Sequence, residues 1–144
     1  MQAQSTPTAE AKRALLQQIE VSFAQGALNA LNYEAMYEGF HSDFAILIPT
    51  GTQELIKLSR DQWIGIVQAY KNDPVQMASG VRNLTYEIEI LDMTDTIAVV
   101  KTQYYRGKSL VITDYLSYIK FDTTWKAVAK ISKDHSINPL NLEF

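Results

Sequence analysis

The sequence predicts an α+β domain in which three N-terminal helices pack in the concave face of a curved antiparallel sheet. Apolar residues recur at helical spacing in the first half, and the period falls to about 2 from residue 82 onward. Two long segments, 109–121 and 124–133, are then joined by the short turn Asp122-Thr123, which predicts a hairpin. Helices followed by a run of adjacent strands are typical of an α+β fold.

Three helices are expected before the main part of the sheet. Leu15, Ile19 and Phe23 share one face of the first helix, which we expect from about residue 7 to residue 25. The third helix has a capping box, Ser59 with Gln62, ahead of its apolar residues. The other boundary signals are the N-cap candidates Thr6 and Asn32, Pro7 at a first helical position, and the terminating residues Gly26 and Pro74.

Six strands are expected, two in a hairpin before the third helix and four in a meander after it. The segments are 43–49, 53–58, 82 to the turn at 92–95, 96–106, 109–121 and 124–133. The last three strands carry apolar residues on both faces, and three helices can cover only one face. We therefore expect the outer face to pack on a second copy of the chain in a homodimer.

The composition favours one soluble domain, with residues 1–7 as a disordered tail and 8–144 as the folded unit. A net charge of −3 without a basic stripe argues against nucleic-acid binding, and no apolar run is long enough for a membrane span. The absence of cysteine excludes disulfides and thiolate metal sites. The chain is expected to be cytoplasmic as written, or periplasmic or secreted if Met1 replaces a removed signal peptide.

Several short motifs in this order resemble the nuclear-transport-factor-2-like superfamily. They are 26–32, 40–44, 58–63, 97–100, 113–116 and 125–130. This is the cystatin-like, cone-shaped α+β fold of ketosteroid isomerase, scytalone dehydratase and SnoaL-type polyketide cyclases, and the closest match within it is the lumazine-binding protein family. The resemblance implies a cavity between the helices and the concave face of the sheet.

His41 and Asp43 are candidates for chemistry at the start of the first strand. Residues two apart in a strand share a face, so both side chains could point into the cavity. His41 would then exchange protons near neutral pH while Asp43 orients its ring. Alternatively, both side chains bond the backbone at the junction between helix and strand.

Asp114 is the carboxylate of most interest because it lies within an otherwise apolar and aromatic strand. A buried carboxylate at this position could serve as a general base. The alternative is a structural ion pair with Lys130, from the neighbouring strand or across a dimer interface. A two-residue turn at Asp122-Thr123 places Asp114 on the face of Trp125, whereas a three-residue bulged turn places it on the opposite face.

Aromatic side chains are numerous enough to line an apolar pocket with a few polar groups. The candidate ligand-binding residues are Tyr37, Trp63, Tyr86, Tyr104, Tyr118 and Trp125. No metal-ligating constellation and no phosphate-binding glycine loop is present, so no cofactor is expected.

Three functions remain open at this stage. The first is a small-molecule-binding domain for an apolar or aromatic ligand. The second is a cofactor-independent isomerase, dehydratase or cyclase-like enzyme, with Asp114 or Asp43 as base, His41 as proton-transfer partner and a tyrosine as oxyanion donor. The third is a scaffold in which the dimer interface matters and the cavity is incidental.

Overall fold

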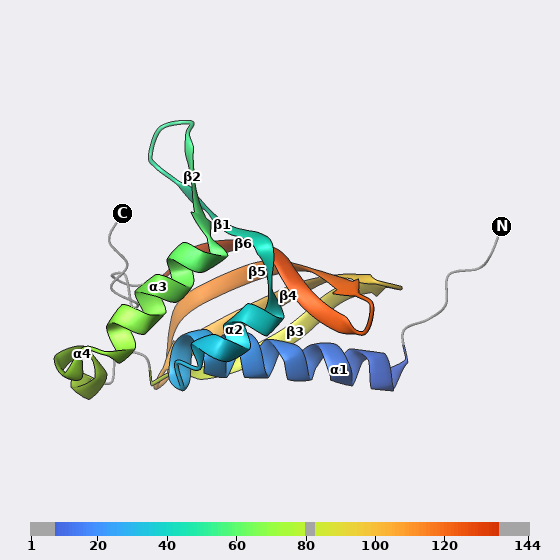
Figure 1. Cartoon of the computed structure of the whole chain (residues 1–144), viewed down its shortest axis with the longest axis horizontal. Coiled ribbons are helices and arrows are strands. Elements are labelled where there is room, and N and C mark those ends of the chain that lie inside the picture. Colours follow the sequence, from blue (N-terminus) through green and yellow to red (C-terminus); the bar gives the residue numbers. More distant parts are fainter. Residues whose placement is uncertain (1–7, 80–82, 136–144) are drawn as a thin grey trace.

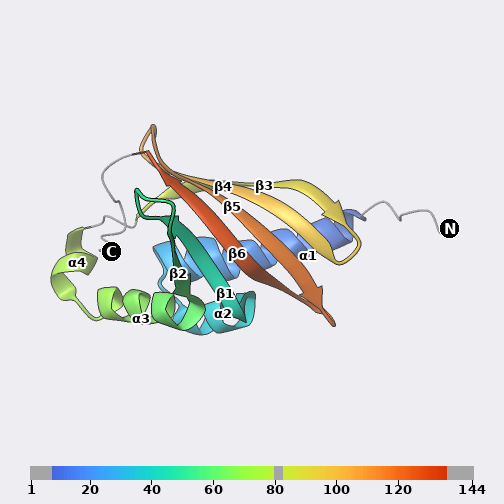
Figure 2. The same cartoon turned by 90° about the horizontal axis from the view of Figure 1, so that it is seen from above.

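The computed structural model describes residues 8–79 and 83–135, which form helices along one face of a curved six-stranded sheet (Figures 1 and 2). The helices are α1 (Ala9–Ile19), the π-helix η1 (Glu20–Asn29), α2 (Tyr33–Gly39), α3 (Arg60–Lys71) and α4 (Pro74–Ser79). The strands are β1 (Phe40–Pro49), β2 (Leu55–Ser59), β3 (Thr85–Thr94), β4 (Ile97–Arg106), β5 (Ser109–Phe121) and β6 (Thr124–Asp134). The α+β cone expected from the sequence is confirmed.

The strand order in the sheet is β2-β1-β6-β5-β4-β3. The meander from β3 to β6 is antiparallel throughout, as the sequence predicts. However, β1 pairs with β6 in parallel, with Ala45 opposite Ala129 and Leu47 opposite Ile131. The sequence does not predict this pairing, because no local signal joins strands that lie about eighty residues apart.

The first helix does not end at Gly26, so this prediction is wrong. The helix continues from α1 into η1 and ends near Leu31, which takes the left-handed conformation with φ 55°. A Cβ on residue 26 would lie 3.0 Å from the Val21 carbonyl oxygen and 3.2 Å from that of Asn32. A side chain at this position would therefore press against two backbone carbonyls, so glycine allows the close packing here. Thr8 caps α1, and the expected cap Thr6-Pro7 lies outside the described residues.

The capping box of α3 is present as predicted. The Ser59 amide donates to Gln62 Oε1 at 3.0 Å, and the Gln62 amide donates to Ser59 Oγ at 3.2 Å. The helix stops at Asn72, but a second, short helix (α4) follows. The Asp73 carboxylate accepts the Val75 amide at 3.0 Å, so Asp73 acts as an N-cap and restarts the helix through Pro74.

Aromatic rings fill the space between the helices and the sheet. Phe23 on η1, Phe40 and Phe44 on β1 and Trp63 on α3 are each no more than 1% exposed. Their ring centroids lie 4.8–6.0 Å apart where they contact one another, mostly edge to face. This aromatic layer forms the floor against which the inner face of the sheet packs.

The packing of α2 against η1 depends on Gly39. A Cβ on residue 39 would lie 2.0 Å from the Oγ of buried Ser22 and 2.1 Å from its Cβ. We expect Gly39→Ala to lower the free energy of unfolding by about 1–3 kcal/mol, since the two helices would have to separate. Urea denaturation followed by circular dichroism measures the change.

Gly65 provides the matched control for this prediction. It lies within α3, and an added Cβ would meet no atom within 4 Å. We expect Gly65→Ala to stabilise the protein by roughly 0.5–1 kcal/mol through helix propensity. A Gly39→Ala variant as stable as the wild type would contradict the proposed steric contact.

Candidate functional site

Asp114 lies on the inner face of the sheet, which decides between the two turns left open by the sequence. Phe121 pairs with Thr124 and Lys120 with Trp125, so the connection is a two-residue turn, with Asp122 at φ 55°. Asp114 therefore shares the face of Trp125 and is only 1% exposed.

Lys130 reaches the same face because of a β-bulge in β6. Tyr118 pairs with Ala127 and Ser117 with Ala129, which leaves Val128 as the extra residue. An extra residue reverses which side chains point inward beyond it, so Lys130 turns toward the interior and Ile131 toward the outside. Their exposures, 5% and 56%, agree with this arrangement.

The two charged side chains form a buried ion pair. Lys130 Nζ lies 3.7 Å from Asp114 Oδ1. Ser132 Oγ on β6 donates a short hydrogen bond to the same carboxylate oxygen, and Thr102 Oγ1 on β4 donates to Oδ2 at 3.4 Å. Both carboxylate oxygens thus have partners, as a buried charge requires.

The ammonium group of Lys130 lies against two aromatic rings of the helical layer. Its Nζ is 4.6 Å from the Trp63 ring centroid and 4.9 Å from that of Phe23. Cations over aromatic faces at this distance are stabilised by the ring quadrupole, more strongly when desolvated. The Asp114–Lys130 pair therefore lies at the centre of the cone, between the sheet, η1 and α3.

Two tyrosines are buried on the inner face of β4 and β5. Tyr104 and Tyr118 are 0% and 1% exposed, and neither hydroxyl has a hydrogen-bond partner among the described residues. Burial raises the pKa of both hydroxyls, and the charge of Asp114 raises that of Tyr104 further. Thr102 has a smaller, opposite effect on the Tyr104 pKa without reaching good hydrogen-bond geometry. Both hydroxyls therefore stay protonated at neutral pH.

His41 and Asp43 are not brought together with Asp114. The His41 ring stacks on Phe121 with centroids 4.9 Å apart, and its Nδ1 accepts the Asp43 amide at 3.0 Å. Phe121 is seven residues from Asp114 along β5, which corresponds to about 23 Å of strand. The Asp43 side chain is 92% exposed and points away from the interior. The bond between the His41 ring and the backbone is of the kind that the structural alternative describes, whereas the Asp43 side chain points into solvent.

The remaining aromatic candidates lie in different environments. Tyr37 is 44% exposed on α2 and packs under the Arg60 guanidinium. Tyr86 joins β3 to η1 by donating to Glu20 at 2.9 Å and accepting from Gln25 at 3.3 Å. Trp125 is buried near α1, where its carbonyl accepts the Gln18 amide. Of the six, Trp63 belongs to the aromatic layer, and Tyr104 contacts that layer through Phe23.

Three polar residues near the pair were missed by the sequence analysis: Thr102, Ser132 and Asp134. The first two complete the shell around Asp114. The pKa of Asp134 is raised, first by partial burial and then by the charge of Asp114. Thr102 could have been found, because it lies opposite Asp114 in the β4–β5 hairpin and side chains on paired strands share a face. The inward direction of Ser132 and Asp134 depends on the bulge in β6, which the sequence does not predict.

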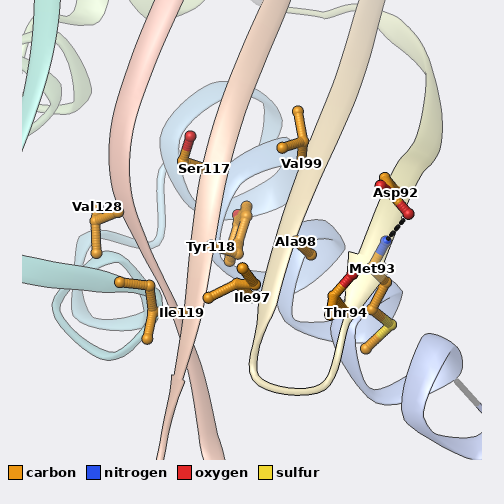
Figure 3. A pocket seen from close by; sticks show the side chains of 10 residues that line it. All are labelled: Asp92, Met93, Thr94, Ile97, Ala98, Val99, Ser117, Tyr118, Ile119 and Val128. Carbon is orange, nitrogen blue, oxygen red and sulfur yellow. Dashed lines mark hydrogen bonds between the residues drawn. The ribbon is translucent and has the colours of Figure 1, made fainter. Parts of the chain in front are cut away.

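A separate hollow of about 300 Å³ opens beside the turn between β3 and β4 (Figure 3). Most of its lining is apolar. Outward side chains such as Ile97 and Val99 line it together with the buried Met93, Ala98 and Tyr118. The lining residues are Asp92, Met93, Thr94, Ile97, Ala98, Val99, Ser117, Tyr118, Ile119 and Val128.

Within residues 8–79 and 83–135, no group of three or more His, Cys, Asp or Glu side chains is arranged to hold a metal ion. None of the helices in these ranges is both long and apolar enough to cross a membrane.

Residues 8–132 match the family described as "Putative lumazine-binding". The chain belongs to this family. No curated protein matches the chain. The match runs from α1 to Ser132 in β6 and so covers both residues of the charged pair.

Solved structures similar to this family member share its fold. An NTF-2 like protein of unknown function from Silicibacter pomeroyi DSS-3 is 16% identical, with a TM-score of 0.68 over 90% of this chain and 100% of that one. An NTF2-like protein of unknown function from Methylobacillus flagellatus KT is 18% identical, with a TM-score of 0.66 over 93% and 100%. A protein of unknown function with a cystatin-like fold, from Nostoc punctiforme PCC 73102, is 13% identical, with a TM-score of 0.63 over 93% and 98%.

The coupling between Asp114 and Lys130 can be measured directly. Lys130→Met leaves the buried carboxylate without this cation, and we expect a loss of about 3–5 kcal/mol in the free energy of unfolding. The double variant Asp114→Asn/Lys130→Met removes both charges and should be clearly more stable than Lys130→Met alone. Urea denaturation of the wild type, both single variants and the double variant gives the coupling energy.

Lys126→Met is the matched control, since Lys126 lies on the same strand with its ammonium in an exposed bond to the Glu38 carbonyl. Its cost should be below about 1 kcal/mol. Additive effects of the Asp114 and Lys130 substitutions would show that the two charges do not interact.

Proposed function

We propose that the chain is a small-molecule-binding domain that holds an apolar or aromatic ligand between the helices and the concave face of the sheet. The observation that carries this proposal is the buried Asp114–Lys130 pair against Trp63 and Phe23. Ligand sites are lined mostly by apolar and aromatic side chains with a few placed polar groups, and the interior of this cone has that composition.

Stability alone accounts poorly for charges at this position. Removing two ions from water costs several kcal/mol each, and well-packed apolar residues of similar size are often as stable or more so. Polar groups retained at such a cost are better explained by a role in orienting a ligand. The description of the family supports a ligand-binding role in general, whereas the fold by itself hosts many unrelated functions.

The alternative, a cofactor-independent enzyme with Asp114 as base, is less well supported by the contacts. Ser132 and Lys130 already engage Oδ1 of Asp114, and Thr102 engages Oδ2. A substrate proton would have to compete with these partners. His41 and Asp43, the other proposed members of a catalytic group, lie at the far end of β5. Binding without turnover requires none of these groups to transfer a proton.

We also propose that the partner is a second copy of the chain, packed on the outer face of the sheet. Ile97, Val99, Tyr115 and Ile131 point outward there and are 44–56% exposed, and the hollow of Figure 3 adds further apolar surface. Large exposed apolar patches on soluble proteins commonly mark interaction sites.

Ligand binding in the interior can be tested with lumazine and 1-indanone as probes, after native mass spectrometry for a co-purified small molecule. We expect at least one probe to raise the melting temperature in proportion to ligand concentration. Trp63→Phe, which reduces the aromatic wall beside Lys130, should weaken that binding about tenfold. Tyr37→Phe, on an exposed ring, should leave it unchanged. Neither a co-purified molecule nor a shift with either probe would contradict the proposal.

The homodimer can be tested by light scattering at micromolar concentration. We expect the wild type to have the mass of a dimer and Ile131→Glu, on the outer face of β6, to have that of a monomer. Leu55→Glu is the control, since Leu55 is also 56% exposed but lies on the edge strand β2. A wild type that is monomeric at these concentrations would rule out this interface.

A further inference from the structure

We propose that the hollow beside the β3–β4 turn is a binding site in its own right, and that its ligand is a small primary amine with an apolar body (Figure 3). The Asp92 carboxylate pairs with the ammonium group, and aliphatic side chains of β4 and β5 contact the rest of the ligand. This inference goes beyond the proposed function, because neither Asp114 nor Lys130 lines the hollow.

Six side chains of the hollow form two rows across three neighbouring strands. Strand pairing places Asp92, Val99 and Ser117 in one row and Thr94, Ile97 and Ile119 in the other. Paired residues on neighbouring strands share a face, so these side chains project from one side of the sheet. The volume of about 300 Å³ is at the lower end of the range for small-molecule sites, so a ligand with a single ring fits.

A β-bulge in β3 turns Asp92 toward the hollow. Ile90 pairs with Val100 and Asp92 with Val99, which leaves Leu91 as the extra residue. In a regular strand Asp92 would point to the same side as Ile90, which packs against the core. The extra residue reverses this direction, and bulges next to functional sites commonly re-aim a side chain in this way. The carboxylate therefore lies beside the hollow and not inside the cone.

The charge of Asp92 is not compensated by any cation in the part of the chain that the structure describes. The ion pairs in residues 8–79 and 83–135 involve other carboxylates. Oδ1 of Asp92 accepts the Met93 amide at 2.9 Å, and Oδ2 has no protein donor in these ranges. Lys101, on the neighbouring strand, lies opposite Glu89. A free carboxylate oxygen beside apolar surface is complementary to a cation with an apolar body.

Polar and aliphatic side chains are separated along the hollow. Asp92 and Thr94 lie two residues apart on the edge strand β3, whereas Ile97 and Val99 lie on β4 and Ile119 on β5. The distance from β3 to β5 is about 10 Å, since neighbouring strands are about 4.8 Å apart. An ammonium group at the β3 edge can donate to both Asp92 and Thr94 while a ring attached to it lies over the aliphatic side chains. An anionic ligand would instead be repelled by Asp92.

The experiment compares three probes that carry the same phenyl ring: 2-phenylethylamine, 2-phenylethanol and 3-phenylpropanoate. Each is titrated into the ¹⁵N-labelled full chain, and the amide signals of β3, β4 and β5 report where it binds. We expect the amine to shift the signals of Ile97, Val99 and Ile119, and to bind about three- to fivefold more tightly than the alcohol, as for a partly exposed ion pair. The carboxylate should bind most weakly, and 0.5 M NaCl should reduce the preference for the amine.

Asp92→Asn and Asp95→Asn form a matched pair of variants. Asp92→Asn should lower the affinity for the amine about three- to fivefold, to that of the alcohol, and leave the affinity for the alcohol unchanged. Asp95→Asn removes a carboxylate from the adjoining turn, where asparagine also tolerates the φ of 52°. This control should keep the preference for the amine, because Asp95 does not line the hollow.

Several outcomes would overturn the inference. Equal binding of the amine and the alcohol, or an unchanged preference in Asp92→Asn, would reject the ion pair. An equal loss in Asp95→Asn would show a general attraction of cations to this end of the sheet and reject a specific site. If no probe shifts the amide signals of the hollow, the site is rejected for the chain in solution. This last result also follows if a second copy of the chain covers the hollow, so the site requires a dimer that leaves the β3–β4 turn accessible.

Discussion

The buried ion pair between Lys130 and Asp114 constrains which side chains can pack around it. Two charges withdrawn from water must be compensated locally, and each neighbour that does so comes from a different part of the chain. Ser132 lies on β6, Thr102 on β4, Phe23 on η1 and Trp63 on α3. The pair therefore joins the sheet to the helical layer, and it gives a largely apolar interior its only charged centre among the residues that the structure describes.

One residue without a side-chain role organises both faces of the sheet. The bulge at Val128 turns Lys130 inward and Ile131 outward, so the inner face gains its cation and the outer face gains an exposed apolar residue. Without the extra residue the two positions would be exchanged, with an isoleucine beside Asp114 and a lysine on the outer surface. The candidate ligand site and the candidate dimer surface thus have a common structural origin.

Features set by local sequence could be predicted, and features set by distant contacts could not. Ser59 and Gln62 specify the start of α3 within four residues, and the alternation from Leu84 to Ile90 specifies which side of β3 is buried. The bulge has no signature of its own, since valine is common in regular strands. Gly26 does not terminate the helix, although glycine often does. The same residue type also serves close packing, and only the contacts with Val21 and Asn32 distinguish the two roles.

The parallel pairing of β1 with β6 has a consequence for the order in which the chain acquires its structure. Residues 45–47 pair with residues 129–131. More than eighty further residues must therefore be synthesised before the backbone groups on that edge of β1 can form their hydrogen bonds. Contacts so distant in sequence slow folding, because the loop must close before any contact stabilises it. During synthesis, the β1–β2 hairpin therefore exposes an unpaired apolar edge, Phe44 to Ile48, for most of the time that the ribosome needs to complete the sheet. A chaperone that shields short extended segments would have its natural target at this hairpin.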